Sequence, residues 1–383
     1  LHADGQPTAL LYAHYDVQPS DPDDEWIAPA FEPDERNGNL YARGTCDDKG
    51  QLWIQVKGLE SLLAATGRLP VNVRVLFEGE EEVGGEGIAN YVASRPADLK
   101  ADFALVSDTE MFAPGLPTLC VGLRGMIYTE LEVRGAKTDL HSGVYGGAAP
   151  NPFMALAQIL AKLKDENGRI LIPGFYDEII PPSAEELKAW RSLPFDEEQY
   201  RIAEVGSREL VGESGYSVLE RTWARPSLDV HGIPGGFTGT GAKTVIPAKA
   251  VAKVSMRLVP GMTPGKSFDL YKRYVQEIAP AGVEVAVRLI NAGDPCLVRV
   301  DNSYIQAAVR ALGEVWGKET VFIRSGGSIP IVGDFDRHLG TPSVMMGFGL
   351  PDDNIHAPNE KIDLKNFRLG IESVVRFLEE AGR

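Results

Sequence analysis

Short apolar runs alternate with amphipathic stretches in the first part of the chain. The runs at 8–13, 71–77 and 102–106 predict strands, and apolar residues spaced three and four apart at 49–65 and 87–95 predict helices. This βαβ rhythm predicts an α/β fold with a largely parallel sheet and helices on both faces. In such a sheet, ligands bind in the crevice at the carboxyl ends of the strands.

The pattern changes at about residue 121. The elements predicted from there are a strand at 126–134, a helix at 151–164, strands at 227–230 and 250–258, a helix at 264–278 and a strand at 283–289. Taken in order they form the unit βαββαβ, which predicts an inserted ferredoxin-like α+β domain. A Pro- and Glu-rich stretch at 170–213 is predicted to be a helical insertion inside it.

The βα rhythm returns after about Cys296. Here we predict a helix at 303–316, strands at 320–323 and 343–348, and a closing helix at 364–380. We therefore expect a discontinuous catalytic domain, with its first part at 1–120 and its second part at 296–383. The segment 121–295 is then an inserted lid and dimerisation domain.

The composition is that of an ordinary globular protein, with 44% hydrophobic and 24% charged residues among 383. A net charge of -16 opposes binding to nucleic acid or to an anionic membrane. Cys46, Cys120 and Cys296 form no Cys-x-x-Cys pair, which argues against a disulfide framework and a thiolate zinc site and suits the cytoplasm. No apolar run is long enough to span a membrane. Because the chain opens almost directly on a strand, we expect a preceding segment to be missing, and any signal peptide would be lost with it.

Residue types that bind metals follow the predicted strands. They are His14 and Asp16 after the first strand, Glu80, Glu81 and Glu82 after the second, Asp108 after the third, His356 after the last, and Asp47 and Asp48 at the start of a helix. Taken singly, an acidic triplet is typical of a solvated surface, a histidine of a hydrogen-bonded filler and an aspartate of a helix cap. At one edge of one sheet, however, the carboxylates would repel one another unless cations were bound between them. Two imidazoles with several carboxylates favour zinc, manganese or cobalt over calcium or magnesium.

Six motifs occur in order along nearly the whole chain. They are His14-x-Asp16, Gly44-x-x-Asp47-Asp48-Lys49-Gly50, Glu78-Gly79-x-Glu81-Glu82-x-Gly84, Ser107-Asp108, Asp139-Leu-His141-Ser-Gly-x-Tyr-Gly-Gly and His356-x-x-Asn-Glu-Lys. With these motifs the sequence resembles the cytosolic nonspecific dipeptidase and carnosinase group. That group belongs to the di-zinc aminoacylase, carboxypeptidase and dipeptidase superfamily.

The resemblance implies a site for two divalent ions per chain, with zinc favoured and manganese or cobalt as alternatives. The implied ligands are Asp47, which bridges both ions, His14 and Asp108 on one ion, and Glu82 and His356 on the other. Glu81 is then the general base, which takes a proton from the activated water and returns it to the leaving amine. Asp16 would accept the other imidazole N–H of His14 and so fix its tautomer, and Asp48 would be structural.

The resemblance also implies residues that contact the substrate. His141 would be presented to the active site of the partner subunit, where it stabilises the oxyanion; the alternative is a loop histidine without that role. Thr244 and Arg257 match positions that hold the substrate carboxylate. Gly327 and Ser328, in the Gly-Gly-Ser-Ile-Pro loop, complete the substrate site. We therefore expect a homodimer.

Three histidines have no motif partner and are interpreted as structural: His2, His231 and His338. Dipeptidases of the group can carry a further histidine where 291–296 has none, so the choice of substrate stays open.

The predicted function is metal-dependent hydrolysis of amide bonds in dipeptides or similar small peptides with a free carboxylate. The alternatives are an N-acyl-amino-acid deacylase or a carboxypeptidase of the same superfamily, whose metal ligands would be the same. A non-catalytic metal-binding relative is a further alternative, against which the presence of Glu81 argues. A two-metal phosphatase is disfavoured because neither a phosphate-cradling glycine loop nor a cluster of basic residues is present.

Overall fold

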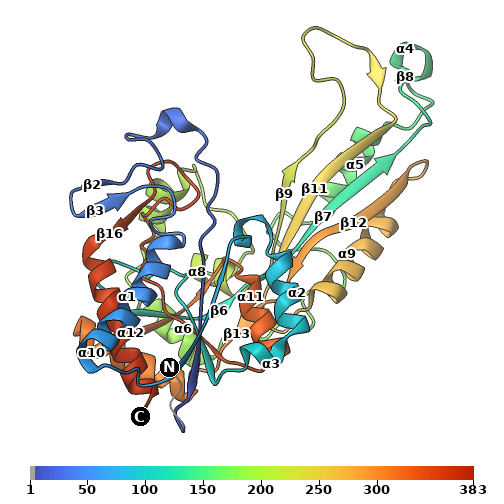
Figure 1. Ribbon diagram of the computed structural model, residues 1–383. Coiled ribbons are helices and arrows are strands. Elements are labelled where there is room, and N and C mark those ends of the chain that lie inside the picture. The colour runs from blue at the N-terminus through green and yellow to red at the C-terminus, as the bar shows by residue number, and fades with distance from the viewer. Residues whose placement is uncertain (1–4) are drawn as a thin grey trace.

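The computed structural model describes residues 5–383, so His2 lies outside the described residues (Figure 1). A seven-stranded sheet forms the larger part of the molecule. Its strands are β1 Thr8–His14, β4 Asn72–Glu78, β5 Phe103–Val106, β6 Thr118–Leu123, β13 Cys296–Leu297, β14 Val321–Ser325 and β15 Ser343–Met345. Their order is β13-β6-β15-β5-β1-β4, with β14 paired to β6. The strands β4, β1, β5 and β15 run parallel, whereas β15 meets β6 antiparallel.

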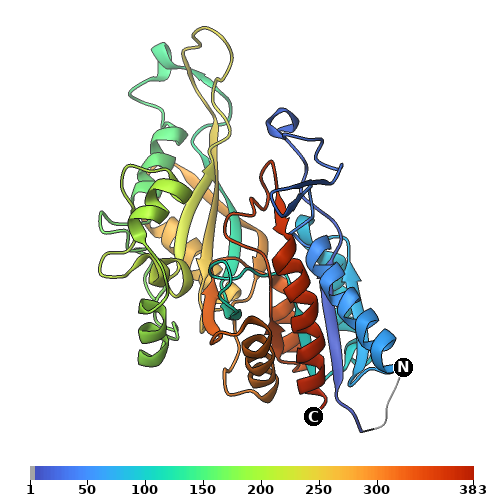
Figure 2. The ribbon, with the colours of Figure 1, turned by 90° about the vertical axis from the view of Figure 1, so that its left-hand side faces the viewer.

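Helices cover both faces of this large sheet, which is why its central strands are apolar along most of their length. They are α1 Lys49–Thr66, α2 Glu86–Ser94, α3 Pro96–Leu99, α10 Ser303–Trp316, α11 Pro330–Asp334 and α12 Leu364–Ala381, with the short turns η1 Asp23–Glu25, η2 Glu81–Val83 and η4 Phe335–Leu339. Figure 1 shows α1, α10 and α12 on one side of the sheet and α2, α3 and α11 on the other, and Figure 2 shows α1 and α12 side by side. In β1, all residues from Ala9 to Ala13 are fully buried, because a parallel strand covered on both faces needs no polar side. The fold is therefore a mixed α/β fold with a mostly parallel sheet.

A second sheet of four antiparallel strands stands beside the first. Its strands are β7 Gly125–Arg134, β9 Ser227–Gly232, β11 Lys249–Leu258 and β12 Glu284–Gly293, in the order β12-β7-β11-β9. The helices α5 Pro152–Ala161 and α9 Pro264–Ile278 pack against it. Buried and partly exposed residues alternate along β7, as expected of a sheet that is covered on one face.

Two small sheets complete the set of strands. The first pairs β8 Leu140–His141 with β10 Val245–Ile246. Together with the helix α4 Ser142–Tyr145, it lies at the tip that extends beyond the four-stranded sheet (Figure 1). The second joins β2 Asp34–Arg36, β3 Asn39–Tyr41 and β16 Lys361–Asp363, and so ties the beginning of the described chain to its end.

The two large sheets are joined by two connections that pass close to each other. One leads from β6 through Arg124 into β7, and the other from β12 into β13. A side chain on Gly125 would lie only 2.5 Å from the carbonyl oxygen of Gly293 and from the nitrogen of Pro295. Only glycine therefore allows the connections to cross at this distance.

The predicted helical insertion at 170–213 divides between the two hydrophobic cores. Its elements and their continuation are α6 Ala184–Arg191, α7 Glu197–Gln199, η3 Tyr200–Val205 and α8 Val218–Trp223. Ile170 and Phe175 belong to the core of the small sheet, as expected for the inserted segment. Trp190, inside the insertion, and Trp223, after it, instead belong to the core of the large sheet. Strand β6, which no prediction covered, runs across the expected boundary at 120/121.

No helix within residues 5–383 combines the length and the apolar character needed to cross a bilayer.

Candidate metal centre

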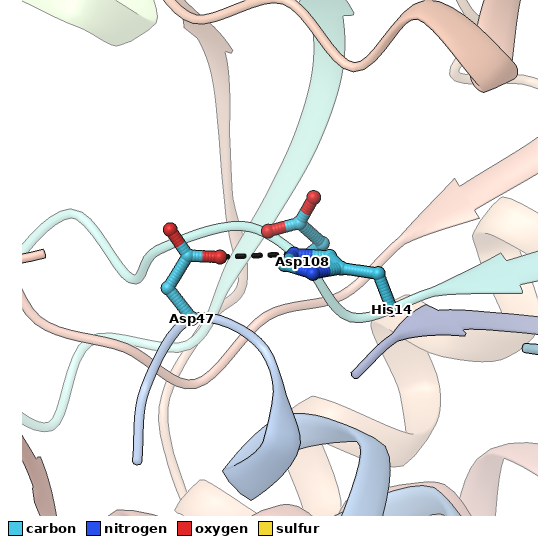
Figure 3. A group of neighbouring side chains, drawn as sticks. All are labelled: His14, Asp47 and Asp108. Carbon is cyan, nitrogen blue, oxygen red and sulfur yellow. Dashed lines mark hydrogen bonds and ion pairs between the residues drawn. The ribbon is translucent and has the colours of Figure 1, made fainter. Parts of the chain in front are cut away.

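Two groups of metal-ligating side chains meet at Asp47. His14 ends β1 and Asp108 follows β5, so the two neighbouring parallel strands bring both residues to one edge of the sheet. Figure 3 shows His14 and Asp108 converging on Asp47, which lies in the loop before α1. The ligand atoms of these three residues lie within 4.8 Å of one another, and those of Asp47, Glu82 and His356 do so as well.

Each carboxylate oxygen of Asp47 faces a different imidazole. Oδ1 lies 3.0 Å from Nε2 of His14, and Oδ2 lies 2.8 Å from Nε2 of His356. Nε2 of His356 also lies 3.4 Å from Oε2 of Glu82. This arrangement fits a carboxylate that bridges two cations, each with one imidazole and one further carboxylate.

The carboxylates of the centre raise the pKa values of its two histidines. Burial opposes a charge on His14, but the hydrogen bond to Asp47 and the nearby carboxylates raise its pKa to about 11. Hydrogen bonds to Asp47 and Glu82 raise the pKa of His356 to about 10. Burial raises the pKa of Asp108 well above its usual range, and the charges of neighbouring aspartates add to the shift. Divalent cations could replace the protons of these groups, so the donor set fits a metal centre.

Asp16 connects His14 to the turn that carries the acidic pair. Its Oδ1 lies 3.3 Å from Nδ1 of His14. The same carboxylate accepts the backbone N–H of Glu81 at 3.3 Å and that of Glu82 at 3.0 Å. One side chain therefore orients a ligating imidazole and fixes the backbone of two acidic residues.

Glu81 faces a cavity of about 660 Å³ that borders both ligand groups. Asp47, Asp108 and His356 line this cavity as well. Burial, with the charges of nearby carboxylates, raises the pKa of Glu81 to about 7. A carboxylate with a pKa near neutrality can both accept and return a proton.

Glu360 holds the loop that carries Asp47, and the sequence interpretation assigned it no role. Its side chain is fully buried. Oε1 accepts the backbone N–H of Cys46 at 2.9 Å and of Asp47 at 3.0 Å, and Oε2 accepts the N–H of Gly44 and Nη1 of Arg43, both at 2.9 Å. Glu360 lies four residues after His356 in the last of the six motifs, but no local pattern in the sequence identifies partners more than 300 residues away.

Gln18 and Asp48 contact the centre from outside the two ligand groups. Nε2 of Gln18 donates to Oε2 of Glu82 at 2.6 Å and so orients that carboxylate. The buried Asp48 accepts the backbone N–H of His14 at 3.2 Å. Gln18 was also missed from the sequence, because a single amide after a strand carries no chemical pattern.

Three of the expected substrate residues lie together. Gly327 and Ser328 line the cavity. Nη1 of Arg257, on β11, donates to Oγ of Ser328 at 2.8 Å. The contact joins the small sheet to a loop of the large sheet.

His141 and Thr244 lie elsewhere in the chain. His141 pairs with Val245 in the small sheet at the tip, and the carbonyl of Thr244 accepts the N–H of Ser142 at 3.1 Å. Both residues are exposed, and neither lines the cavity of the ligand groups. Within one chain, the structure therefore does not bring them to the metal centre.

Two other histidines make contacts inside their own units. Nε2 of His231 lies 2.7 Å from Oγ of Ser255, and its ring stacks on Tyr128. Nε2 of His338 lies 4.0 Å from Oδ1 of Asp334.

Comparison with known proteins gives consistent matches over nearly the whole chain. The model of peptidase family M20/M25/M40 matches residues 10–380. Cys-Gly metallodipeptidase DUG1 of Candida albicans is 37% identical over 385 residues, covering 98% of this chain and 79% of that protein. Beta-Ala-His dipeptidase of Homo sapiens is 32% identical over 378 residues, covering 97% and 74%. The structure of the M20 family metallo-carboxypeptidase Sso-CP2 from Sulfolobus solfataricus superposes with a TM-score of 0.90 at 33% identity, covering 100% of this chain and 86% of that chain.

Proposed function

Because the chain belongs to peptidase family M20/M25/M40, it is a metallopeptidase, and we propose that it hydrolyses the amide bond of dipeptides with a free carboxylate. The observation that carries the proposal is Asp47, whose two oxygens face two imidazoles beside Glu81 in one cavity. The dipeptidases among the relatives support the choice of substrate.

The proposed cofactor is a pair of divalent ions, with zinc favoured by the donor set. Asp47 would bridge the ions, with His14 and Asp108 holding one, and Glu82 and His356 holding the other. When bound, such ions act as Lewis acids on the scissile carbonyl and lower the pKa of a water molecule.

The side chains around the ions would move and position protons. Glu81 accepts a proton from the attacking water on its carboxylate and returns it to the leaving amine. Asp16 accepts the Nδ1–H of His14, so that the lone pair of Nε2 would be free to hold an ion together with Asp47. Arg257 and Ser328 bind the substrate carboxylate, which aligns the amide bond with Glu81.

We extend the proposal to a homodimer in which 121–295 acts as lid and dimerisation domain. His141 and Thr244 lie at an exposed tip, next to Val144 with 69% of its surface exposed. The edge strand β12 exposes Leu289 and Ile290. A partner related by two-fold symmetry would cover such surfaces and receive His141 in its own cavity.

A substrate panel tests the activity. The metal-loaded protein is offered dipeptides, N-acetyl amino acids and longer peptides, and kcat/KM is measured for each. We expect dipeptides to be the best substrates. Faster cleavage of N-acetyl amino acids would make the protein a deacylase, and stepwise release of C-terminal residues from longer peptides would make it a carboxypeptidase.

Complementation between inactive variants tests the composite site. His141→Ala and Glu81→Gln chains are each expected to be nearly inactive, because an oxyanion donor contributes about 10²- to 10³-fold. Co-expressed, they should form heterodimers in which one of two sites has both groups. As a control, Glu81→Gln is co-expressed with the double variant, which should not restore activity. Heterodimers as inactive as their parents would place His141 outside catalysis in the partner.

A further inference from the structure

Arg124 lies at the crossing between the two sheets and contacts the substrate loop from two sides. Its Nε donates to the carbonyl of Gly326 at 3.0 Å. Its own backbone carbonyl accepts a hydrogen bond from Oγ of Ser328. The loop from Gly326 to Ser328 is thus fastened to the connection between β6 and β7 by a guanidinium and by a main-chain oxygen.

A second guanidinium approaches the same loop from the small sheet. Nη1 of Arg257 donates to Oγ of Ser328, so this one hydroxyl group connects both arginines. Neither arginine has a carboxylate within ion-pair distance among residues 5–383. Asp229 acts on both charges at longer range, and it is exposed.

The electrostatic consequence is a concentration of positive charge that Asp229 offsets only at longer range. Burial, and then the charge of Arg257, lower the pKa of Arg124 to about 10, and burial also lowers the pKa of Arg257. Partly desolvated cations that repel each other are stabilised when an anion binds between them. Gly327 and Ser328 belong to the loop that both arginines contact, and they line the cavity of the metal centre, so an anion bound at these two residues would lie in the substrate cavity.

We propose that Arg124 is a positioning residue for the substrate carboxylate: it fixes the loop from Gly326 to Ser328 and adds its positive charge to that of Arg257. This inference rests on the proposed function, because the anion is the free carboxylate of a peptide. Neither arginine lines the cavity: Arg257 approaches it through Ser328, to which it donates, and Arg124 acts through the loop and through its charge.

The bound carboxylate would also connect the two sheets. Arg257 belongs to β11 of the small sheet, whereas Ser328 belongs to a loop of the large sheet. Arg124, between β6 and β7, holds this loop at the point where the sheets join. The residue is thus placed to make carboxylate binding depend on the relative position of the two sheets.

The test compares substrates with and without the carboxylate. Metal-loaded wild type, Arg124→Gln and Arg124→Lys are assayed with a dipeptide and with its C-terminal amide. Hydrogen bonds of charged groups contribute enough to change binding about 10- to 100-fold. We expect Arg124→Gln to raise KM for the free dipeptide by about 10-fold or more, with little change in kcat, and to leave kcat/KM for the amide unchanged. Arg124→Lys, which keeps the charge, should recover part of the loss.

Two controls separate positioning from folding. Arg299→Gln removes an exposed arginine paired with Asp301 and should change neither substrate. The double variant Arg124→Gln, Arg257→Gln should lose less than the product of the single losses, because both would act on one carboxylate. An equal fall in kcat/KM for dipeptide and amide, or no change for either, would overturn the inference. Wild type that cleaves no dipeptide would instead refute the proposed function.

Discussion

Replacing Glu360 with glutamine should loosen the metal centre without removing any proposed ligand. The carboxylate accepts four hydrogen bonds, three from backbone N–H groups of the loop 44–47 and one from Arg43. The amide of glutamine has one acceptor oxygen. Its NH₂ group would therefore face two donors, and the loop that carries Asp47 would have to move.

The magnitude follows from the contacts that are lost. A hydrogen bond to a charged group contributes about 1.5–3 kcal/mol. Arg43, with 5% of its surface exposed, would keep a buried charge without a carboxylate partner, which costs about 3–5 kcal/mol. Because these effects share one group, they do not add, and we expect a loss of about 3–5 kcal/mol in the free energy of unfolding.

The assay measures stability and metal retention together. Urea unfolding is followed in the metal-free protein, and metal retention is measured by competition with a chelator. Glu379→Gln is the matched control, since that carboxylate is 33% exposed and pairs with Arg376 on the surface of α12. We expect that control to stay within about 0.5 kcal/mol of wild type. Wild-type stability and metal retention in Glu360→Gln would refute the view that Glu360 holds the loop.

Three further predictions concern the metals and the protons that they replace. Metal-reconstituted protein should contain about two ions per chain by elemental analysis, and a ratio of one or none would contradict a bridging Asp47. Glu81→Gln should keep both ions and lose about 10²- to 10⁴-fold in kcat, whereas near-wild-type turnover would assign the base elsewhere. The metal-free protein should lose stability as the pH rises. The folded-state pKa of Glu81, about 7, and those of His14 and His356, about 11 and 10, all exceed the values of 4.5 and 6.5 for the free groups. The folded state therefore binds more protons, and their stabilising effect is complete below those free values and lost through the folded-state values. Urea unfolding in chelator from about pH 5 to about pH 9 measures this, and rising stability over that range would contradict it.

Long and regular patterns predict their elements well. The helix predicted at 49–65 is α1 Lys49–Thr66, and the helix predicted at 264–278 is α9 Pro264–Ile278. Strand β6 was missed because all six of its residues are buried, so its short apolar run between Pro117 and Gly125 has no alternation. Trp190, inside the expected insertion, joins the core of the large sheet, and an apolar side chain alone does not specify which of two cores it joins.

The contacts of the candidate site, too, could be predicted from the sequence only in part. The convergence of His14, Asp108 and Asp47 could be anticipated, because parallel strands bring their carboxyl ends to one edge. The contacts of Glu360 and Arg124 could not, because they depend on neighbours more than 200 residues away along the chain. Such pairings leave no periodic trace in the sequence.

The distribution of the ligand groups along the chain sets an order of assembly during synthesis. His14, Asp47 and Asp108 lie within one stretch of the chain at 14–108, whereas His356 and Glu360 follow more than 240 residues later. A nascent chain can therefore present the first group to a metal ion while the second group is still incomplete. The hydrogen bonds that hold the Asp47 loop form later still, because Glu360 is synthesised after His356. Because His356 follows Asp47 by 309 positions, the second group can close only after that intervening stretch has been synthesised.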